Sequence, residues 1–236
     1  MTALPDLARR VREPEVMDDP GLDVARHRLA LDALARVNRL SLTAARVWRE
    51  VRALAAAGVH PVRVLDVACG DGDVLLGVGS RARRHGVAVE LCGCDVSPVA
   101  LEKARARMAG EGHARFVELD VLRDELPGPQ HLTTSSLFLH HLEDQDAARL
   151  LTRMAALAER FVLVQDLRRT RMGYVLAWAA LRVLTTSDVA RSDGPASVRA
   201  AFTVSEARAL AVRAGLASAE VTACWPQRFT IRWARS

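Results

Sequence analysis

From residue 62 onward, short apolar runs alternate with stretches whose apolar residues recur at helical spacing. Runs rich in apolar and β-branched residues predict strands over 62–68, 87–95, 114–120, 131–139 and 160–166. The spacing between these runs predicts helices over 74–85, 98–109 and 144–158. Strands that alternate with helices favour a parallel sheet with both faces covered. The pattern therefore predicts an α/β fold.

The first 58 residues precede the first strand and have a different pattern. Residues 1–20 hold three prolines and are expected to form an arm, with at most a short helix around 4–11. Helical periodicity then predicts helices over 22–40 and 42–57. We therefore expect an N-terminal helical arm or cap at 1–58, followed by the main domain at 59–236.

After residue 166 the alternation ends. An apolar helix is predicted over 174–184 and a polar loop over 185–197, so that 167–202 forms an insertion on the substrate side. Thr203 and Glu206 have the spacing of a capping box, which predicts the start of another helix. The β-rich runs 219–224 and 228–233 predict a final pair of strands.

The length and composition fit a single α/β domain with a helical addition. The chain has 236 residues and a net charge of +5, which raises the question of nucleic-acid binding. Its basic residues are scattered among acids along the predicted helices, and no basic block with interleaved aromatic residues occurs, so we expect no nucleic-acid partner. No apolar run reaches 18 residues and no secretory signal is recognisable, so we expect no membrane span and a cytoplasmic location.

Four cysteines, two of them in the sequence Cys92-Gly93-Cys94, raise the question of a metal or a disulfide. A single residue between two thiols is shorter than the usual spacing of structural zinc ligands. Because this segment is predicted to be a strand, we interpret the cysteines as buried, reduced thiols and propose no metal from them.

The clearest candidate for chemistry is the segment VLDVACGDGDV at residues 64–74. A strand ends near Asp66, a loop follows with Gly70 and Gly72, and a helix comes next. Glycines let the backbone approach a ligand closely, and a carboxylate at a strand end can accept hydrogen bonds from a cationic group such as an ammonium. The nicotinamide-binding pattern G-x-G-x-x-G would require a third glycine at Leu75, so that alternative does not match.

Two further acids close the next two predicted strands. Asp95 ends the second strand about 25 residues after the glycine loop, where a carboxylate can bind ribose hydroxyls. Asp120 ends the third strand and is suited to accept a hydrogen bond from an adenine amino group. Because ligands of α/β sheets bind at the carboxyl ends of the strands, the three acids are expected to meet in one crevice.

On these segments, together with SSLFLHHLED and FVLVQDLRR, the sequence resembles class I S-adenosylmethionine-dependent methyltransferases, in particular the ubiquinone/menaquinone-methyltransferase-like group. The resemblance covers roughly residues 60–170. It implies a Rossmann-like, mostly parallel seven-stranded sheet with an antiparallel last strand, and S-adenosyl-L-methionine as cofactor with S-adenosyl-L-homocysteine as product. The cofactor contacts that it implies are Asp66, Ala68, Cys69, Gly70, Asp71, Gly72, Asp95, Val96, Asp120, Val121 and Ser135.

The chain departs from this family at two places. Ala68 stands where the glycine loop often has its first glycine. Ser135 and Ser136 stand where related enzymes often carry Asn or Asp, in the segment that passes beside the transferred methyl group.

His140 and His141, just after the fourth predicted strand, are the candidate catalytic residues. Methyl transfer to a hydroxyl benefits from a general base, and the reference pKa of histidine suits that role. Adjacent residues at a helix start diverge by about 100°, so only one of the two is expected to face the pocket, with His140 slightly preferred. The alternative is that both merely end the strand and begin the next helix.

Four residues of the predicted insertion are candidate substrate contacts by position alone: Arg168, Tyr174, Trp178 and Arg191. The apolar helix over 174–184 is expected either to roof a hydrophobic pocket or to serve as a packing helix or homodimer contact. We predict an enzyme that methylates a small molecule, on a phenolic or polyketide-like hydroxyl. C-methylation of a quinone-type ring is the alternative, and a non-catalytic cofactor-binding protein is the alternative of another class.

Overall fold

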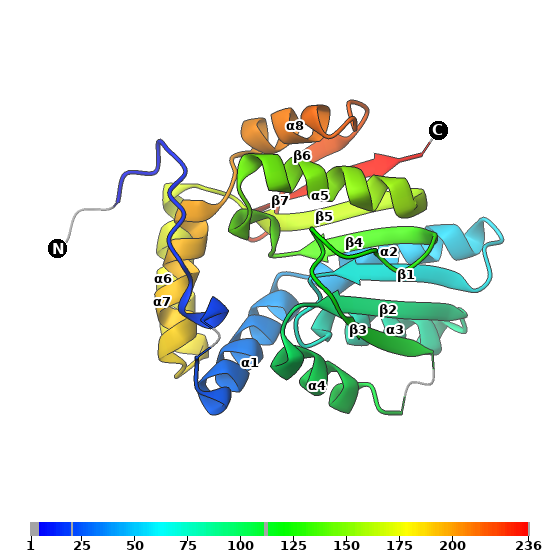
Figure 1. The fold of residues 1–236 in the computed structure, drawn as a ribbon, viewed down its shortest axis with the longest axis horizontal. Coiled ribbons are helices and arrows are strands. Elements are labelled where there is room, and N and C mark those ends of the chain that lie inside the picture. The colour runs from blue at the N-terminus through cyan, green and yellow to red at the C-terminus, as the bar shows by residue number, and fades with distance from the viewer. Residues whose placement is uncertain (1–4, 20, 111–112, 236) are drawn as a thin grey trace.

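The computed structural model describes residues 5–19, 21–110 and 113–235, and a seven-stranded sheet forms its centre (Figure 1). The strands are β1 (Val62–Val67), β2 (Val89–Asp95), β3 (Ala114–Glu118), β4 (Gln130–Ser136), β5 (Ala158–Leu167), β6 (Glu220–Cys224) and β7 (Arg228–Ala234). Their order in the sheet is β3-β2-β1-β4-β5-β7-β6. Only β7 runs antiparallel to its neighbours β5 and β6. The predicted mostly parallel sheet with an antiparallel last strand is therefore confirmed.

Helices cover both faces of the sheet, as the alternating pattern predicts. The α-helices are α1 (Val24–Leu40), α2 (Thr43–Ala56), α3 (Asp73–His85), α4 (Pro98–Arg107), α5 (Asp144–Leu157), α6 (Arg171–Leu184), α7 (Asp188–Ala200) and α8 (Val204–Arg213), and the short 3-10 helices are η1 (Val16–Asp18) and η2 (Leu139–His141). Apolar residues of α2 and α3 form one core with β1, and those of α5 and α8 form a second core with β5 and β7. A third, small cluster joins α1, α6 and α7. The capping box predicted at Thr203 is present at the start of α8. No helix in these ranges is long and apolar enough to cross a bilayer.

The predicted polar loop over 185–197 is wrong, because most of it is helix α7. Ser187 caps this helix by accepting a hydrogen bond from the backbone N–H of Ala190. Gly194 lets α7 approach α6 closely, since a Cβ at this position would lie 2.0 Å from Leu181 Cδ1. Burial of one face of α7, which includes Val189 and Val198, therefore stabilises the helix more than its Ser, Gly and Pro residues destabilise it.

The N-terminal arm is extended rather than helical where the structure describes it, from residue 5 to 15; Leu4 of the predicted short helix lies outside the described residues. The arm runs along α7 (Figure 1), and the backbone N–H of Val11 donates to the carbonyl of Arg199. Arg10 donates from Nη2 to the carbonyl oxygens of His140 (2.8 Å) and Leu142 (2.6 Å). The arm is thereby fixed next to η2, at the carboxyl end of β4.

Candidate active site

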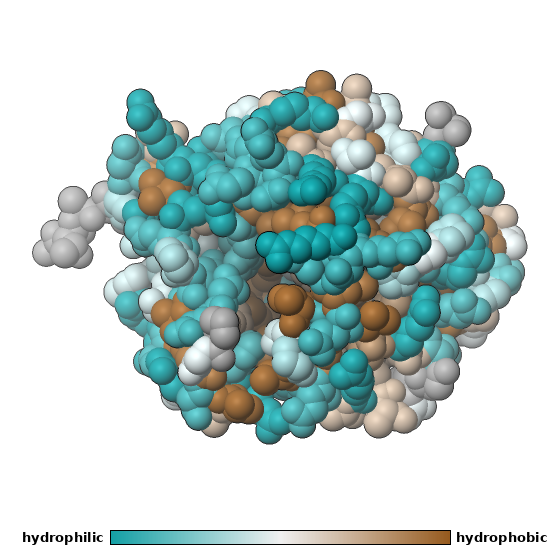
Figure 2. Space-filling model, in the orientation of Figure 1, coloured by the Kyte–Doolittle hydropathy of each residue, from teal (hydrophilic) through white to brown (hydrophobic). Residues whose placement is uncertain are grey.

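A cavity of about 720 Å³ lies at the carboxyl ends of β1, β2 and β4, with η1 and α1 on its opposite side. Figure 2 shows a hollow near the centre of this face with hydrophobic side chains at its edge. The sequence-predicted residues that line the cavity are Asp66, Ala68, Cys69, Gly70, Asp71, Asp95, Val96, Asp120, Val121 and His141. The topology thus gathers nearly all of the predicted cofactor contacts in one place.

Asp66, at the end of β1, is the most deeply buried acid of this group. Its side chain is 1% exposed, and its Oδ1 has no hydrogen-bond partner in the structure. Burial, together with the nearby charges of Asp73 and Asp95, raises its pKa well above the ordinary value. A buried carboxylate that borders a cavity and lacks a partner is suited to a cationic ligand group.

The loop after β1 bends through left-handed backbone conformations. Ala68, Gly70 and Gly72 have φ angles of 55°, 54° and 72°. Gly72 caps α3 and does not line the cavity, and a Cβ there would lie 3.1 Å from Ala104 Cβ and 3.2 Å from the Phe116 ring. Glycine at this position therefore serves both the turn and the close packing beneath it.

Replacing Ala68 by glycine is expected to stabilise the fold. A left-handed conformation costs an L-residue roughly 1–2 kcal/mol, and the greater freedom of glycine in the unfolded chain offsets part of the gain. We expect the free energy of unfolding to rise by up to about 1 kcal/mol in denaturant titrations. The control is the exposed Ala57, whose φ is −83°. Ala57→Gly should lower the free energy of unfolding. Equal destabilisation by both substitutions would show that the conformation of Ala68 is not a source of strain.

Asp95 links the glycine loop to the second strand. Its Oδ2 accepts a hydrogen bond from the Gly70 backbone N–H (2.8 Å), and its Oδ1 accepts one from the Ser97 N–H (2.9 Å). Burial raises its pKa, an effect that these backbone hydrogen bonds partly oppose. Asp120 lies farther along the cavity and accepts from the Leu122 N–H (2.9 Å). Each carboxylate oxygen still has a lone pair for a ligand.

The two histidines have different surroundings, and only His141 lines the cavity. His140 is 3% exposed, and its Nδ1 lies 2.7 Å from Asp166 Oδ1. Burial alone would lower the pKa of His140, but the carboxylates of Asp166 and Glu15 outweigh it and raise the pKa to about 10. A buried imidazolium of this kind cannot accept a proton from a substrate, so the preference for His140 is revised in favour of His141.

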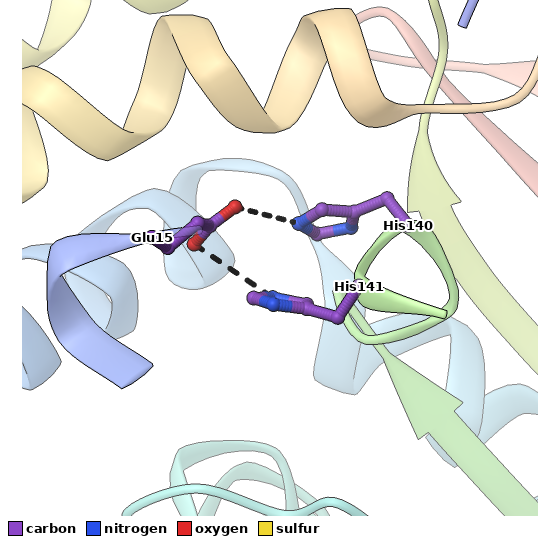
Figure 3. A group of neighbouring side chains, drawn as sticks. All are labelled: Glu15, His140 and His141. Carbon is purple, nitrogen blue, oxygen red and sulfur yellow. Dashed lines mark ion pairs between the residues drawn. The ribbon is translucent and has the colours of Figure 1, made fainter. Parts of the chain in front are cut away.

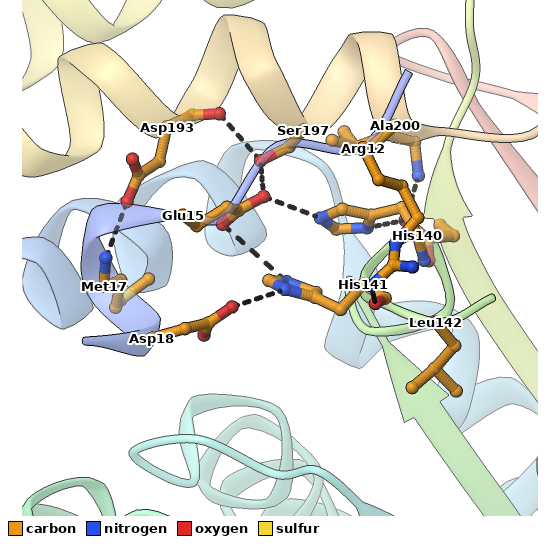
Figure 4. A network of polar contacts seen from close by, with 12 residues as sticks. Arg12, Glu15, Met17, Asp18, His140, His141, Leu142, Asp193, Ser197 and Ala200 are labelled. Atoms are coloured by element: carbon orange, nitrogen blue, oxygen red, sulfur yellow. Dashed lines mark hydrogen bonds and ion pairs between the residues drawn. The ribbon is translucent and has the colours of Figure 1, made fainter. Parts of the chain in front are cut away.

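His141 Nδ1 lies 3.1 Å from Asp18 Oδ2, and its ring stacks on Phe138. A carboxylate at Nδ1 favours the tautomer with the proton on Nδ1, which leaves the lone pair on Nε2. In Figure 4, Asp18 approaches this imidazole from η1, on the arm. The result is a carboxylate-oriented histidine beside the cavity.

The predicted substrate residues and Ser135 do not line the cavity. Arg168 bonds Gln227 Oε1, Arg191 bonds the Arg182 carbonyl, and Trp178 is exposed beneath the Arg182 guanidinium. Tyr174 lies on the same helix as Trp178 and is likewise absent from the lining. Ser135 is buried within β4, whereas its neighbour Ser136 borders the cavity, because successive residues of a strand point to opposite faces.

Sequence reasoning missed lining residues that come from the arm and α1, among them Asp18 and His27. It also missed Asp73, the first residue of α3. Asp73 directly follows the glycine loop, so its position at a helix N-terminus was a usable signal. The lining residues of the arm have no comparable signal in the sequence. Their position depends on where the arm, a segment without periodicity, packs on the rest of the protein.

Comparison with known proteins agrees with the fold described above. Residues 64–160 match the family model described as a methyltransferase domain. The demethylmenaquinone methyltransferase of Deinococcus radiodurans is 42% identical over 99 residues, which span 42% of this chain and 38% of that relative.

Solved structures resemble the chain over more of its length. The magnesium protoporphyrin IX methyltransferase of Synechocystis PCC 6803 with bound S-adenosylhomocysteine has a TM-score of 0.58 at 18% identity, covering 92% of this chain and 90% of that one. An O-methyltransferase family protein from Burkholderia thailandensis has a TM-score of 0.63 at 20% identity, covering 89% and 62%. The fold is that of the class I methyltransferases. Residues 64–160 thus match a methyltransferase domain, and the solved structures of this fold include one with bound S-adenosylhomocysteine, the product form of the cofactor S-adenosylmethionine.

The residues at the cavity fit this cofactor. The unpartnered Asp66 carboxylate suits its ammonium group, Asp95 suits ribose hydroxyls, and Asp120 suits the adenine amino group. These individual contacts are our assignment, and mutation of Asp95 is the direct test of it.

Cofactor binding is expected to weaken as the pH falls through 7. Burial and the charge of Asp71 raise the pKa of Asp73 to about 7, so this carboxyl is largely protonated in the free protein below that pH. A cationic ligand favours the ionised form, and binding at low pH must therefore release a proton. We expect S-adenosylhomocysteine to bind up to about eightfold more tightly at pH 7.5 than at pH 6, measured by calorimetry. Asp66, whose pKa burial also raises, contributes to the same dependence, so Asp73→Asn should make it shallower without abolishing it. Equal slopes in both proteins would refute the role of Asp73.

Proposed function

We propose that this chain is an S-adenosylmethionine-dependent methyltransferase that methylates a hydroxyl oxygen of a small phenolic or polyketide-like molecule. The observation that carries the proposal is the Asp18–His141 pair beside the cofactor cavity, since removal of a hydroxyl proton needs a base at this place. The resemblance in fold to an O-methyltransferase family protein supports oxygen as the atom that is methylated.

The cofactor, when bound, supplies a methyl carbon on a sulfonium sulfur, which keeps the electron pair of the bond that breaks. The protein's contribution is to place the acceptor oxygen in line with that bond and to accept its proton. Nε2 of His141 takes the proton, and Asp18 holds the resulting imidazolium in its orientation. Phe138, stacked on His141, adds an apolar wall against which an aromatic acceptor can lie.

C-methylation of a quinone-type ring is the second candidate, and the match to a demethylmenaquinone methyltransferase favours it. The same base would then remove a proton from the ring carbon or its hydroxyl. A cofactor-binding protein without turnover is the third candidate.

Incubation of the purified protein with labelled S-adenosylmethionine and a panel of phenols, polyketide-like hydroxy compounds and quinols separates these candidates. We expect the labelled methyl group on the oxygen of a phenolic acceptor. The product would then be an aryl methyl ether, which is stable to alkali and is identified by mass spectrometry. Label on ring carbon would support the second candidate. Tight cofactor binding without transfer to any acceptor would support the third.

A further inference from the structure

Three side chains from distant parts of the chain converge beside the cavity. Glu15 of the arm lies between His140 and His141 of η2, and one ligand atom from each residue falls within 4.8 Å of the others. Figure 3 shows both imidazole rings turned toward the same carboxylate. We propose that Glu15, His140 and His141 form a binding site for one divalent transition-metal ion, of which Zn²⁺ is the model.

The separations in this cluster, which are those of ion pairs, also leave room for a metal ion between the three side chains. His140 Nε2 lies 3.6 Å from Glu15 Oε1, and His141 Nε2 lies 3.8 Å from Glu15 Oε2, both too long for a hydrogen bond. With metal–ligand bonds of about 2.1 Å, ligand atoms this far apart subtend angles of roughly 120–130° at the ion. Two histidines and a carboxylate are a ligand set that zinc and related ions accept.

Each of the three ligands is also oriented by a second residue. Asp166 Oδ1 lies 2.7 Å from His140 Nδ1, and Asp18 Oδ2 lies 3.1 Å from His141 Nδ1. Metal-binding histidines commonly donate their second ring N–H to a carboxylate in this way, which directs the other nitrogen at the ion. Glu15 Oε1 accepts a hydrogen bond from Ser197 Oγ (2.6 Å), which fixes the carboxylate to α7 (Figure 4).

Charge and access both suit a cation. Glu15, Asp18 and Asp166 place three carboxylates around two imidazoles, and Asp193 lies next to them on α7, where it accepts the backbone N–H groups of Val16 and Met17. Glu15 and His140 are buried, whereas His141 lines the cavity. An ion held by three protein ligands therefore retains coordination positions on the side of the cavity.

This inference goes beyond the proposed function and competes with it at one atom. A bound ion takes the His141 Nε2 lone pair that the proposed mechanism uses as a base. It also displaces the Nε2 proton of the His140 imidazolium, which is released to solvent. Turnover and cofactor binding are therefore measured on chelator-treated protein. Metal binding is measured on the same protein after metal is added. Either proposal can then be refuted while the other stands.

The test is titration of the chelator-treated full chain with Zn²⁺ by calorimetry and with Co²⁺ by visible absorption. We expect about one ion per chain, with weak binding of Mg²⁺, which prefers oxygen ligands. Glu15→Gln and His141→Ala should each weaken Zn²⁺ binding at least tenfold, and Asp18→Asn roughly 10–100-fold, as loss of an orienting carboxylate does.

Glu13→Gln is the matched control, because this exposed carboxylate on the same arm pairs with Arg199 and not with the cluster. It should leave the affinity unchanged. Retained S-adenosylhomocysteine binding shows that each variant is folded. Failure to bind stoichiometric Zn²⁺ or Co²⁺ would overturn the site, and so would equal binding by wild type, Glu15→Gln and His141→Ala, since the ion would then lie elsewhere, for instance on the thiols.

Discussion

Replacement of Asp95 by alanine is expected to weaken S-adenosylhomocysteine binding about a hundredfold, with the fold intact. Asp95 is assigned two ribose hydroxyls, and hydrogen bonds to a charged group contribute about 1.5–3 kcal/mol each. A loss of about 3 kcal/mol corresponds to roughly a hundredfold in the dissociation constant. The same side chain also holds the Gly70 N–H, so the glycine loop loses its anchor as well.

Two further substitutions make this prediction specific. Asp95→Asn keeps one oxygen acceptor and should give an intermediate affinity. Asp146→Ala changes a partly exposed acid on α5 that does not line the cavity, and it should have no effect. Calorimetry measures the affinities, and thermal unfolding checks that each variant is folded. Unchanged binding by Asp95→Ala would remove the ribose assignment and with it most of the argument for this cofactor geometry.

The sheet and the cofactor end of the site could be predicted from sequence for a physical reason. Parallel strands all end at the same edge, so acids that close successive strands, such as Asp66 and Asp95, must meet there once the strands pair. The alternation of strands and helices is a local signal that tertiary contacts reinforce. The same holds for the capping box at Thr203, whose two hydrogen bonds lie within four residues.

The acceptor end could not be predicted because its contacts are not local. Glu15 reaches His140 only after the arm docks on η2 through Arg10, more than a hundred residues away in sequence. The periodicity of α6 shows that the helix is amphipathic but not which neighbour covers its apolar face. Trp178 was expected to contact the substrate, and it lies at the surface instead. Whether α7 is a loop or a helix was decided by its packing against Leu181, a contact that its own residues do not reveal.

The choice between two adjacent histidines shows the same limit at the scale of one residue. Their position after β4 predicts that one of them faces the cavity, but not which. The deciding contact is with Asp166 at the end of β5, the strand next to β4. Asp166 Oδ2 accepts a hydrogen bond from the backbone N–H of His140, and Asp166 Oδ1 lies 2.7 Å from His140 Nδ1. With His140 held in this way, His141 is the residue left to face the acceptor.

Replacement of His141 by alanine is accordingly expected to lower kcat for a phenolic acceptor by about 10²–10⁴-fold, the usual contribution of a general base. The metal-free His141→Ala variant should still bind S-adenosylhomocysteine with nearly wild-type affinity, because the assigned cofactor contacts of Asp66, Asp95 and Asp120 remain. An acceptor that is already ionised at the assay pH needs no base, so its methylation should fall far less. A loss of the same size for both acceptors would mean that His141 positions the substrate and is not its base. Asp18→Asn should reduce kcat more modestly, because the imidazole remains and only its orienting carboxylate is lost.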